Sequence, residues 1–310
     1  MGGGRTIGGV EEPSQAELEA AHCWEPYDRV PGSPEMTAFR RTLRLHQARW
    51  RAAQGHPIGS QPINPKPGAE TRPVGSRLPV AYARETGATF LTPAALEAAT
   101  ARTATKEPHQ TFDRQRLWAD LLWAPAMAVN LFSGADDRAV HTWWPDAPGP
   151  LHEIRFEHSP GRLDPAFLGN LSSFAAAFLF DTGTIGVRAL YQEPARSEIP
   201  KPRNLDRYRE VAMRSGVFTK TGLDHIGQAR RSDLTEIWLD HLLVLSMLQH
   251  PSERWGWGRL VLLHPAGHTQ AADAAERYRS LLRPDDTTFA TLTLEEAATT
   301  DAVRERYIVS

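Results

Sequence analysis

The 310-residue sequence has only one cysteine, Cys23, and therefore cannot form an internal disulfide bond. This excludes a disulfide-stabilised extracellular fold, and a reducing compartment is the expectation. The sequence also lacks any apolar run near the roughly 18 residues that a membrane-spanning helix needs, and its N-terminus lacks the apolar segment of a secretory signal. We therefore expect a cytoplasmic protein with no membrane partner. No pattern in the sequence specifies an oligomeric state.

Neither sign of charge is in large excess, because 35 Lys and Arg residues stand against 37 Asp and Glu residues, a net charge of −2. The molecule as a whole therefore does not attract nucleic acid, and any basic surface must be local. Hydrophobic residues make up 41% of the chain and charged residues 23%, which is typical of a globular protein. A chain of this length is long enough to bury a full core.

One segment departs from this balance of charge. Residues 194–231 carry nine basic side chains and four acidic ones, a local excess of five. Because phosphate attraction depends on local positive charge, this segment is the candidate surface for binding DNA. The nucleic-acid-binding candidates within it are Lys201, Arg203, Arg207 and Arg209.

The N-terminal part divides into three kinds of segment. Residues 1–34 are rich in Gly, Pro and Glu, and we expect them to be poorly ordered. Residues 35–110 read as a helical arm with a proline-rich linker. The helix spans 34–54, and its arginines are expected to form a solvated face, with contact to phosphates as the alternative. Residues 56–77 follow, with five prolines and three glycines. Residues 111–310 read as the main domain.

The main domain alternates apolar helices with short apolar strands. Ahead of the main domain, Thr92 and Pro93 predict the start of a helix. Within the domain, Pro125 should kink or split a helix over 113–132. Asp233 with Glu236 forms a capping-box pattern before a helix that is apolar on almost every side. Further helices are expected at 204–214 and 267–282 and at the C-terminus, with strands at 259–264 and 288–294. This order predicts an α/β fold with a central mixed sheet flanked by helices.

A hairpin over residues 155–193 is the centre of the chain. It reads as a loop, a strand over 173–180, a turn in which Gly183 is able to take a positive φ, and a strand over 184–191. Period-2 alternation puts Phe174, Ala176, Phe178 and Phe180 on one face of the first strand. Hairpins often build a metal site from one residue of the first strand and an i, i+2 pair on the second. The candidate positions here are Ala175, Arg188 and Leu190, and none of them can bind a metal.

These segments resemble the PD-(D/E)XK nuclease superfamily, and more narrowly a bacterial, restriction-endonuclease-like branch. The similarity runs from about residue 39 to the C-terminus. The segments that carry it are RLWADLL and NLF within 116–132, FEHSPGRLDPAFLG at 156–169, SSFAAAF at 172–178, VRALYQE at 187–193, RYREVAMRSGVF at 207–218, IWLDHLLVLSML at 237–248 and LVLLHPAGH at 260–268.

The resemblance implies a divalent-metal nuclease with a restriction-endonuclease-like sheet. In such enzymes an Asp on the first strand and a Glu on the second hold Mg²⁺, and a Lys two residues further on positions the attacking water. Laid over this chain, the branch's pattern puts Ala175 at the Asp, Arg188 at the Glu and Leu190 at the Lys. At about 4 Å and an effective dielectric near 20, the Arg188 guanidinium would disfavour each unit of charge on the ion by about 4 kcal/mol.

Three hypotheses follow from this degenerate pattern. The first is a pseudoenzyme that keeps the nuclease fold and binds nucleic acid without a metal cofactor. The second is an active Mg²⁺-dependent nuclease that uses relocated carboxylates, chiefly Glu157, Asp164 and Glu193. The third is a non-catalytic protein-interaction module in which the cleft is packed shut and Arg188 pairs with Glu193 or Asp164.

Overall fold

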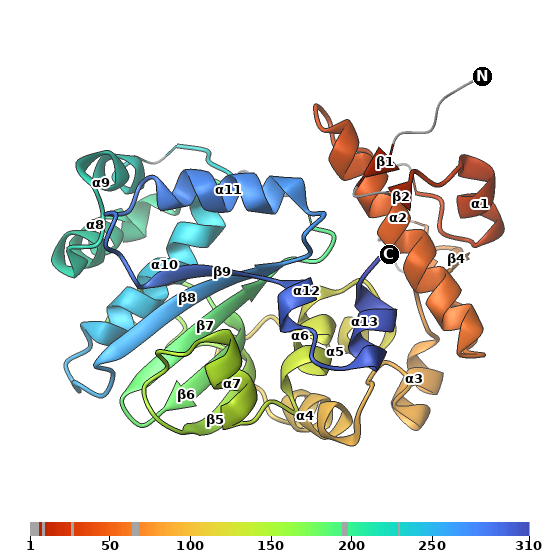
Figure 1. Cartoon of the computed structure of the whole chain (residues 1–310), viewed down its shortest axis with the longest axis horizontal. Helices are drawn as coiled ribbons and strands as arrows, with labels where there is room; N and C mark the ends of the chain where they lie inside the picture. The colour runs from red at the N-terminus through yellow and green to blue at the C-terminus, as the bar shows by residue number, and fades with distance from the viewer. Residues whose placement is uncertain are drawn as a thin grey trace.

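A five-stranded sheet lies at the centre of the computed structural model, which describes residues 6–7, 10–25, 28–63, 68–193, 198–228 and 230–309 (Figure 1). Its strands are β5 (Leu151–His158), β6 (Phe174–Phe180), β7 (Gly183–Ala189), β8 (Trp257–His264) and β9 (Phe289–Thr293). They pair in chain order, antiparallel from β5 to β7 and parallel from β7 to β9. The predicted mixed sheet flanked by helices is confirmed.

Four helices and a short 3₁₀ turn connect the parallel strands. Between β7 and β8 lie η2 (Pro202–Asn204), α8 (Leu205–Ser215), α9 (Lys220–Ile226) and α10 (Thr235–Leu248), and α11 (Thr269–Arg279) joins β8 to β9. Gly216 ends α8 with a φ of 69°, as expected of a helix-terminating glycine. The predicted capping box of α10 is wrong, because Asp233 pairs with Arg277 and the helix begins without a side-chain cap.

The opposite side of the sheet carries α4 (Pro93–Ala104), α5 (Arg114–Ala119), α6 (Ala124–Phe132), α7 (Asp137–Trp143), α12 (Leu294–Ala297) and α13 (Asp301–Tyr307). Thr92 caps α4, and Pro125 sits in the first turn of α6, so the predicted long helix is split as expected. The Phe178 ring meets those of Phe132 and Trp144, with centroids 5.2 and 5.1 Å apart. These aromatic contacts pack α6 and the end of α7 against the sheet.

The N-terminal segments are more structured than the sequence suggested. They form β1 (Thr6–Ile7), β2 (Val10–Glu11), α1 (Gln15–Ala20), α2 (Pro34–Ala53), β3 (Gly59–Pro62), β4 (Thr71–Val74) and α3 (Val80–Thr86). Within residues 1–34, α1 packs on α2 with Leu18 and Cys23 fully buried. The first five residues, on which the prediction of poor order chiefly falls, lie outside the described residues, as do 8–9 and 26–27. Instead of a plain linker, residues 59–74 hold the antiparallel β3–β4 pair.

One apolar core joins α2 to the rest of the chain. Met36 and Leu43 of α2 belong to the same buried cluster as Val187 of β7 and Tyr307 of α13. The boundary expected at residue 110 therefore does not coincide with a break in the core. No helix in the described ranges is both long and apolar enough to cross a bilayer.

The arginines of α2 are largely buried, against the expectation of a solvated face. Arg44 is 3% exposed and pairs with the fully buried Asp28, and Arg51 donates to the carbonyl oxygens of His56 and Gly75. Buried guanidinium groups require such partners because an uncompensated charge away from water is costly. Partners distant in the sequence supply them, so a helical periodicity argument could not detect this burial.

The central hairpin differs from its prediction in three details. Strand β5 continues to His158, so residues 155–158 are part of a strand where a loop was expected. Gly183 has no positive φ, and it is the first residue of β7, where an added Cβ would lie 2.5 Å from Pro148 Cγ. Phe174 packs with the cluster on the α10 side rather than with Ala176 and Phe178, because its ring fills the space above Gly186.

Candidate functional site

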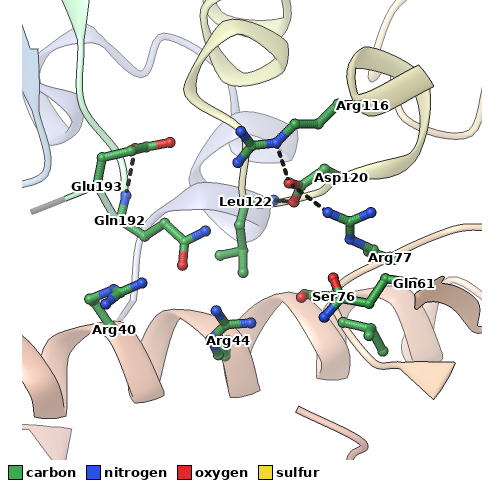
Figure 2. A pocket seen from close by; sticks show the side chains of 11 residues that line it. Arg40, Arg44, Gln61, Ser76, Arg77, Arg116, Asp120, Leu122, Gln192 and Glu193 are labelled. Atoms are coloured by element: carbon green, nitrogen blue, oxygen red, sulfur yellow. Dashed lines mark hydrogen bonds and ion pairs between the residues drawn. The ribbon is translucent and has the colours of Figure 1, made fainter. Parts of the chain in front are cut away.

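A cleft of about 290 Å³ opens where β5, β6 and β7 meet the first turns of α6 and α10. We call it the β7 cleft. Its lining residues are Arg116, Trp123, Ala124, Pro125, Glu157, Ser173, Ala175, Arg188, Ala189, Leu190, Glu193 and Glu236. A second cavity adjoins it, and Arg116 and Glu193 line both (Figure 2).

The three positions that the resemblance aligned with the metal site all line the β7 cleft. Ala176 of β6 pairs with Val187 of β7, so Ala175 and Arg188 occupy neighbouring positions on adjacent strands. Leu190 follows the end of β7, is 8% exposed and belongs to the apolar cluster under α10. The structure therefore brings together a methyl group, a guanidinium and an isobutyl group.

Arg188 is held by two carboxylates of α10. Its Nη2 lies 2.6 Å from Glu236 Oε2, and its Nη1 lies 2.7 Å from Asp240 Oδ2. Burial opposes the charge on Arg188, but pairing with these carboxylates outweighs it and raises the pKa of the guanidinium. Burial also raises the pKa of Asp240 to about 6, with Arg188 opposing that shift. At neutral pH the pair is thus ionised and fixed in place.

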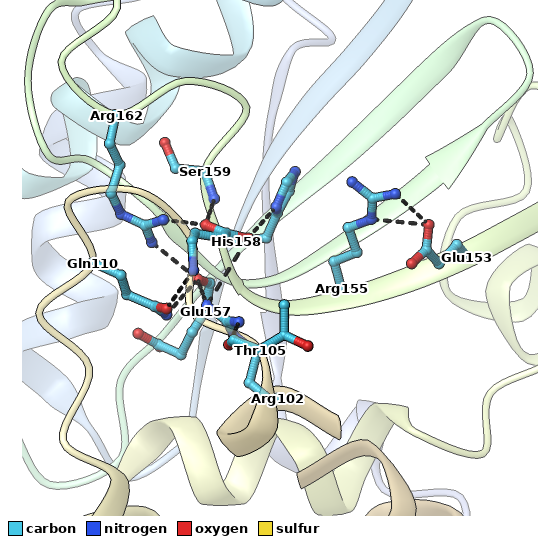
Figure 3. Close-up of polar contacts among 10 residues, drawn as sticks. Arg102, Thr105, Gln110, Glu153, Arg155, Glu157, His158, Ser159 and Arg162 are labelled. Carbon is cyan, nitrogen blue, oxygen red and sulfur yellow. Dashed lines mark hydrogen bonds and ion pairs between the residues drawn. The ribbon is translucent and has the colours of Figure 1, made fainter. Parts of the chain in front are cut away.

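Glu157, near the end of β5, adopts a left-handed backbone conformation that residues other than glycine rarely take, with a φ of 48°. Its carbonyl oxygen accepts hydrogen bonds from Arg162 at 3.0 Å and from Arg102 and Gln110 at 3.4 Å each (Figure 3). The three donors stabilise this conformation, in which the Glu157 side chain lines the β7 cleft.

The cluster behind Glu157 is centred on Glu107. His158 Nδ1 lies 2.7 Å from Glu107 Oε1, and Arg162 donates to the other carboxylate oxygen. Although burial opposes it, hydrogen bonding from His158 and Arg162 lowers the pKa of Glu107 to about 2. His158 is therefore a hydrogen-bonded structural residue in this geometry.

The Glu157 carboxyl is in a different electrostatic state. Burial raises its pKa to about 7, although the charges of Arg162, Arg102 and Arg188 oppose the shift. A carboxyl with a pKa near neutrality beside a cleft is typical of groups that exchange protons. It is the one relocated candidate whose side chain is both in the cleft and without a hydrogen bond in the described part of the chain.

The other two relocated candidates are engaged elsewhere or lie outside the cleft. Glu193 lines the cleft, but its Oε2 accepts from the backbone amides of Tyr191 and Gln192. Asp164 is exposed in the loop after β5, where its Oδ1 accepts from the amide of Ala166. The three carboxylates do not converge.

The basic candidates of the segment 194–231 divide into two groups. Lys201 and Arg203 are exposed beside the start of α8. Arg207 instead ties the loop before β6 to α8 by donating to the carbonyl oxygens of Ala166 and Phe167, and Arg209 bonds Asp206 and the carbonyl of Gly227. Arg196, counted in the charge excess, lies outside the described residues.

The comparison with known families agrees with this arrangement. A profile of the PD-(D/E)XK nuclease superfamily matches residues 34–307, most of the chain. The chain belongs to this superfamily. No curated protein and no solved structure matches it significantly.

A PD-(D/E)XK nuclease holds its metal with carboxylate oxygens, and the donor set here does not fit Mg²⁺. Ala175 and Leu190 offer no ligand atom, and the guanidinium of Arg188 occupies the oxygens of Glu236 and Asp240. Those two carboxylates balance the charge of Arg188. A metal is therefore disfavoured by the lack of ligand atoms and not by repulsion from Arg188. Among the described residues, no group of three or more His, Cys, Asp or Glu side chains is placed to bind a metal.

Sequence reasoning missed two of the residues that define this site. Asp240 is a buried acid within the apolar helix α10, and a lone charged residue in such a helix indicates a buried partner. Glu236 was assigned to a capping box because its local spacing fits one. Their pairing with Arg188 spans about 50 residues of sequence, so no local pattern could show it.

Replacing Arg188 by methionine should destabilise the protein in a pH-dependent way. The change leaves Asp240 buried without its cation, which raises the pKa of this carboxyl further above the unfolded value of about 3.9. A raised folded pKa favours the protonated form, so stability is lost as the pH rises through it. We expect a deficit of about 3–5 kcal/mol at pH 8 and a smaller one at pH 5, measured by urea unfolding.

The double variant Arg188→Met/Asp240→Asn is the matched control, because the neutral amide needs no cation. It should recover most of the stability at pH 8. An Arg188→Met deficit that is the same at both pH values would show that the ion pair does not act as described.

The raised pKa of Glu157 can be read from the stability of Glu157→Gln. The wild-type carboxyl contributes stability below its unfolded pKa of about 4.3 and loses it as the pH rises through about 7. Relative to wild type, the variant should therefore be more stable at pH 8 than at pH 5. Glu153→Gln on the same strand is the control, because pairing with Arg155 lowers the pKa of Glu153. The difference in unfolding free energy between Glu153→Gln and wild type should therefore stay constant from pH 5 to pH 8. A constant difference for Glu157→Gln would contradict the assignment.

Proposed function

We propose that this chain is a PD-(D/E)XK protein that no longer hydrolyses phosphodiesters with a metal ion and that binds the nucleic-acid backbone. The observation that carries the first part is the pairing of Arg188 with Glu236 and Asp240 between Ala175 and Leu190. A metal would have to displace a guanidinium from two carboxylates at hydrogen-bonding distance. Breaking such a pair leaves a buried cation without a partner, which is strongly unfavourable.

The binding part rests on superfamily membership and on charge that does not depend on the metal. Phosphate contacts need only positioned cations, so binding can persist when hydrolysis is lost. Lys201 and Arg203 are exposed and occur in the most basic segment of the chain. Arg207 and Arg209 contribute indirectly, because they fix the loops around α8.

A second candidate function is a protein-interaction module without nucleic-acid binding. The observation that favours it is the burial of Leu190, the residue that the resemblance aligns with the nuclease lysine, in the core beneath α10. An electrophoretic mobility shift assay separates the two functions, because only the first predicts salt-dependent binding of a labelled duplex.

The proposed function predicts binding without cleavage. Supercoiled plasmid incubated with the protein and Mg²⁺ or Mn²⁺ should stay intact, and a labelled duplex should be retarded at low ionic strength. In the variant Lys201→Gln/Arg203→Gln, the dependence of log affinity on log salt should fall by about 2, roughly 1 per lost phosphate contact. Arg138→Gln, an exposed arginine on α7, should leave the slope unchanged.

Two results would overturn this proposal separately. Plasmid cleavage that disappears in Glu157→Ala would show an active nuclease with relocated carboxylates. Absence of a retarded band at low ionic strength would remove nucleic-acid binding and favour the interaction module.

A further inference from the structure

The second cavity, of about 190 Å³, lies between α2, the segment after β4 and α5 (Figure 2). We call it the arginine cavity. Four arginines line it: Arg40 and Arg44 from α2, Arg77 from the end of the β3–β4 region and Arg116 from α5. These residues come from three separate segments, so only the tertiary fold brings their positive charges together.

The carboxylates near the arginine cavity are already engaged. Asp120 Oδ2 lies 2.7 Å from Arg116 Nε and 3.5 Å from Arg77 Nη2. Asp28 lies beneath the α2 arginines, fully buried. Glu193 is turned to the backbone amides of Tyr191 and Gln192, so the guanidinium groups of Arg77 and Arg116 share the carboxylate of Asp120. Two cations beside one carboxylate favour an anion in the cavity.

Gln192 is the observation that points to a specific ligand. The residue is 8% exposed, and its Oε1 has no hydrogen-bond partner within the described chain. Figure 2 shows its amide turned into the cavity, between the side chains of Arg40, Arg44 and Leu122. Buried amide oxygens are nearly always hydrogen-bonded in folded proteins. A donor on a ligand would satisfy this one.

We propose that the arginine cavity binds a phosphate monoester carried by a sugar, as in a nucleotide. Guanidinium forks match phosphate oxygens in geometry and charge, and a sugar hydroxyl supplies the donor that Gln192 lacks. The cavity is smaller than the roughly 300–1,000 Å³ of sites for drug-sized molecules, so the ligand is compact. The monoester is either that of a free nucleotide or the end of a strand entering from the β7 cleft, which shares Arg116.

This site goes beyond the proposed function, because it requires neither a metal nor the surface around Lys201. Isothermal titration calorimetry with adenosine 5′-monophosphate and with adenosine tests it directly. The monophosphate should bind and adenosine should not. The variant Lys201→Gln/Arg203→Gln should keep the monophosphate affinity, so failure of the nucleic-acid proposal and of this one are distinguishable.

Two substitutions locate the binding in the arginine cavity. Arg77→Gln should weaken the affinity for the monophosphate by about tenfold or more, as expected when a hydrogen bond to a charged group is lost. It should fold, because the guanidinium contacts Asp120 only at 3.5 Å and is partly exposed. The nearly isosteric Gln192→Glu should abolish binding by adding negative charge, whereas Arg138→Gln on α7 should not change it. Thermal unfolding of each variant checks that it folds, and Arg77→Lys replaces Arg77→Gln if that variant does not.

The source of the monoester follows from a strand comparison. A single-stranded decamer with a 5′-phosphate that binds more tightly than both the 5′-hydroxyl decamer and the monophosphate identifies a strand end. A monophosphate that binds more tightly than either decamer identifies a free nucleotide. No detectable heat with millimolar monophosphate, or an affinity unchanged in both Arg77→Gln and Gln192→Glu, would overturn the proposal.

Discussion

The guanidinium of Arg188 lies 2.6 and 2.7 Å from two carboxylates of α10, and the arrangement of the β7 cleft depends on this contact. The resemblance aligns β7 with a strand that presents a carboxylate to a metal. Here the strand presents the cation, and the neighbouring helix presents the anions. The same electrostatic attraction thus joins β7 to α10 within the protein. Because Asp240 is 3% exposed, that attraction is only weakly screened by water.

The residues on either side of this ion pair are apolar. Ala175 and Leu190 add apolar surface on either side of Arg188, and Leu190 continues the core beneath α10. Glu157 is the exception, since its strained backbone and raised pKa are features that usually accompany function rather than packing. Its carbonyl is held by three donors, so the surrounding structure maintains that conformation at a cost in backbone strain.

The β7 cleft and the arginine cavity form a connected polar region along one side of the sheet. Arg116 and Glu193 belong to both, and α2 closes the far side with arginines whose partners lie in distant segments. α2 packs into the same apolar core as the sheet and places Arg40 and Arg44 around the same cavity as Gln192 and Glu193, which follow β7.

The sequence by itself determined the α/β class, the two strands of the hairpin, the split at Pro125 and the alternation that puts Ala176, Phe178 and Phe180 on one face. These features depend on local periodicity, proline geometry and helix capping, which act over a few residues. The sequence also indicated the superfamily, which the family profile shows, and it singled out Ala175, Arg188 and Leu190 as candidate positions. Only the tertiary structure decided that Arg188 pairs with Glu236 and Asp240, that Asp164 lies outside the cleft, and that Arg40, Arg44 and Arg51 of α2 are buried. Those outcomes depend on electrostatic contacts between residues far apart in the chain, whose partners are set by packing and not by spacing in the sequence.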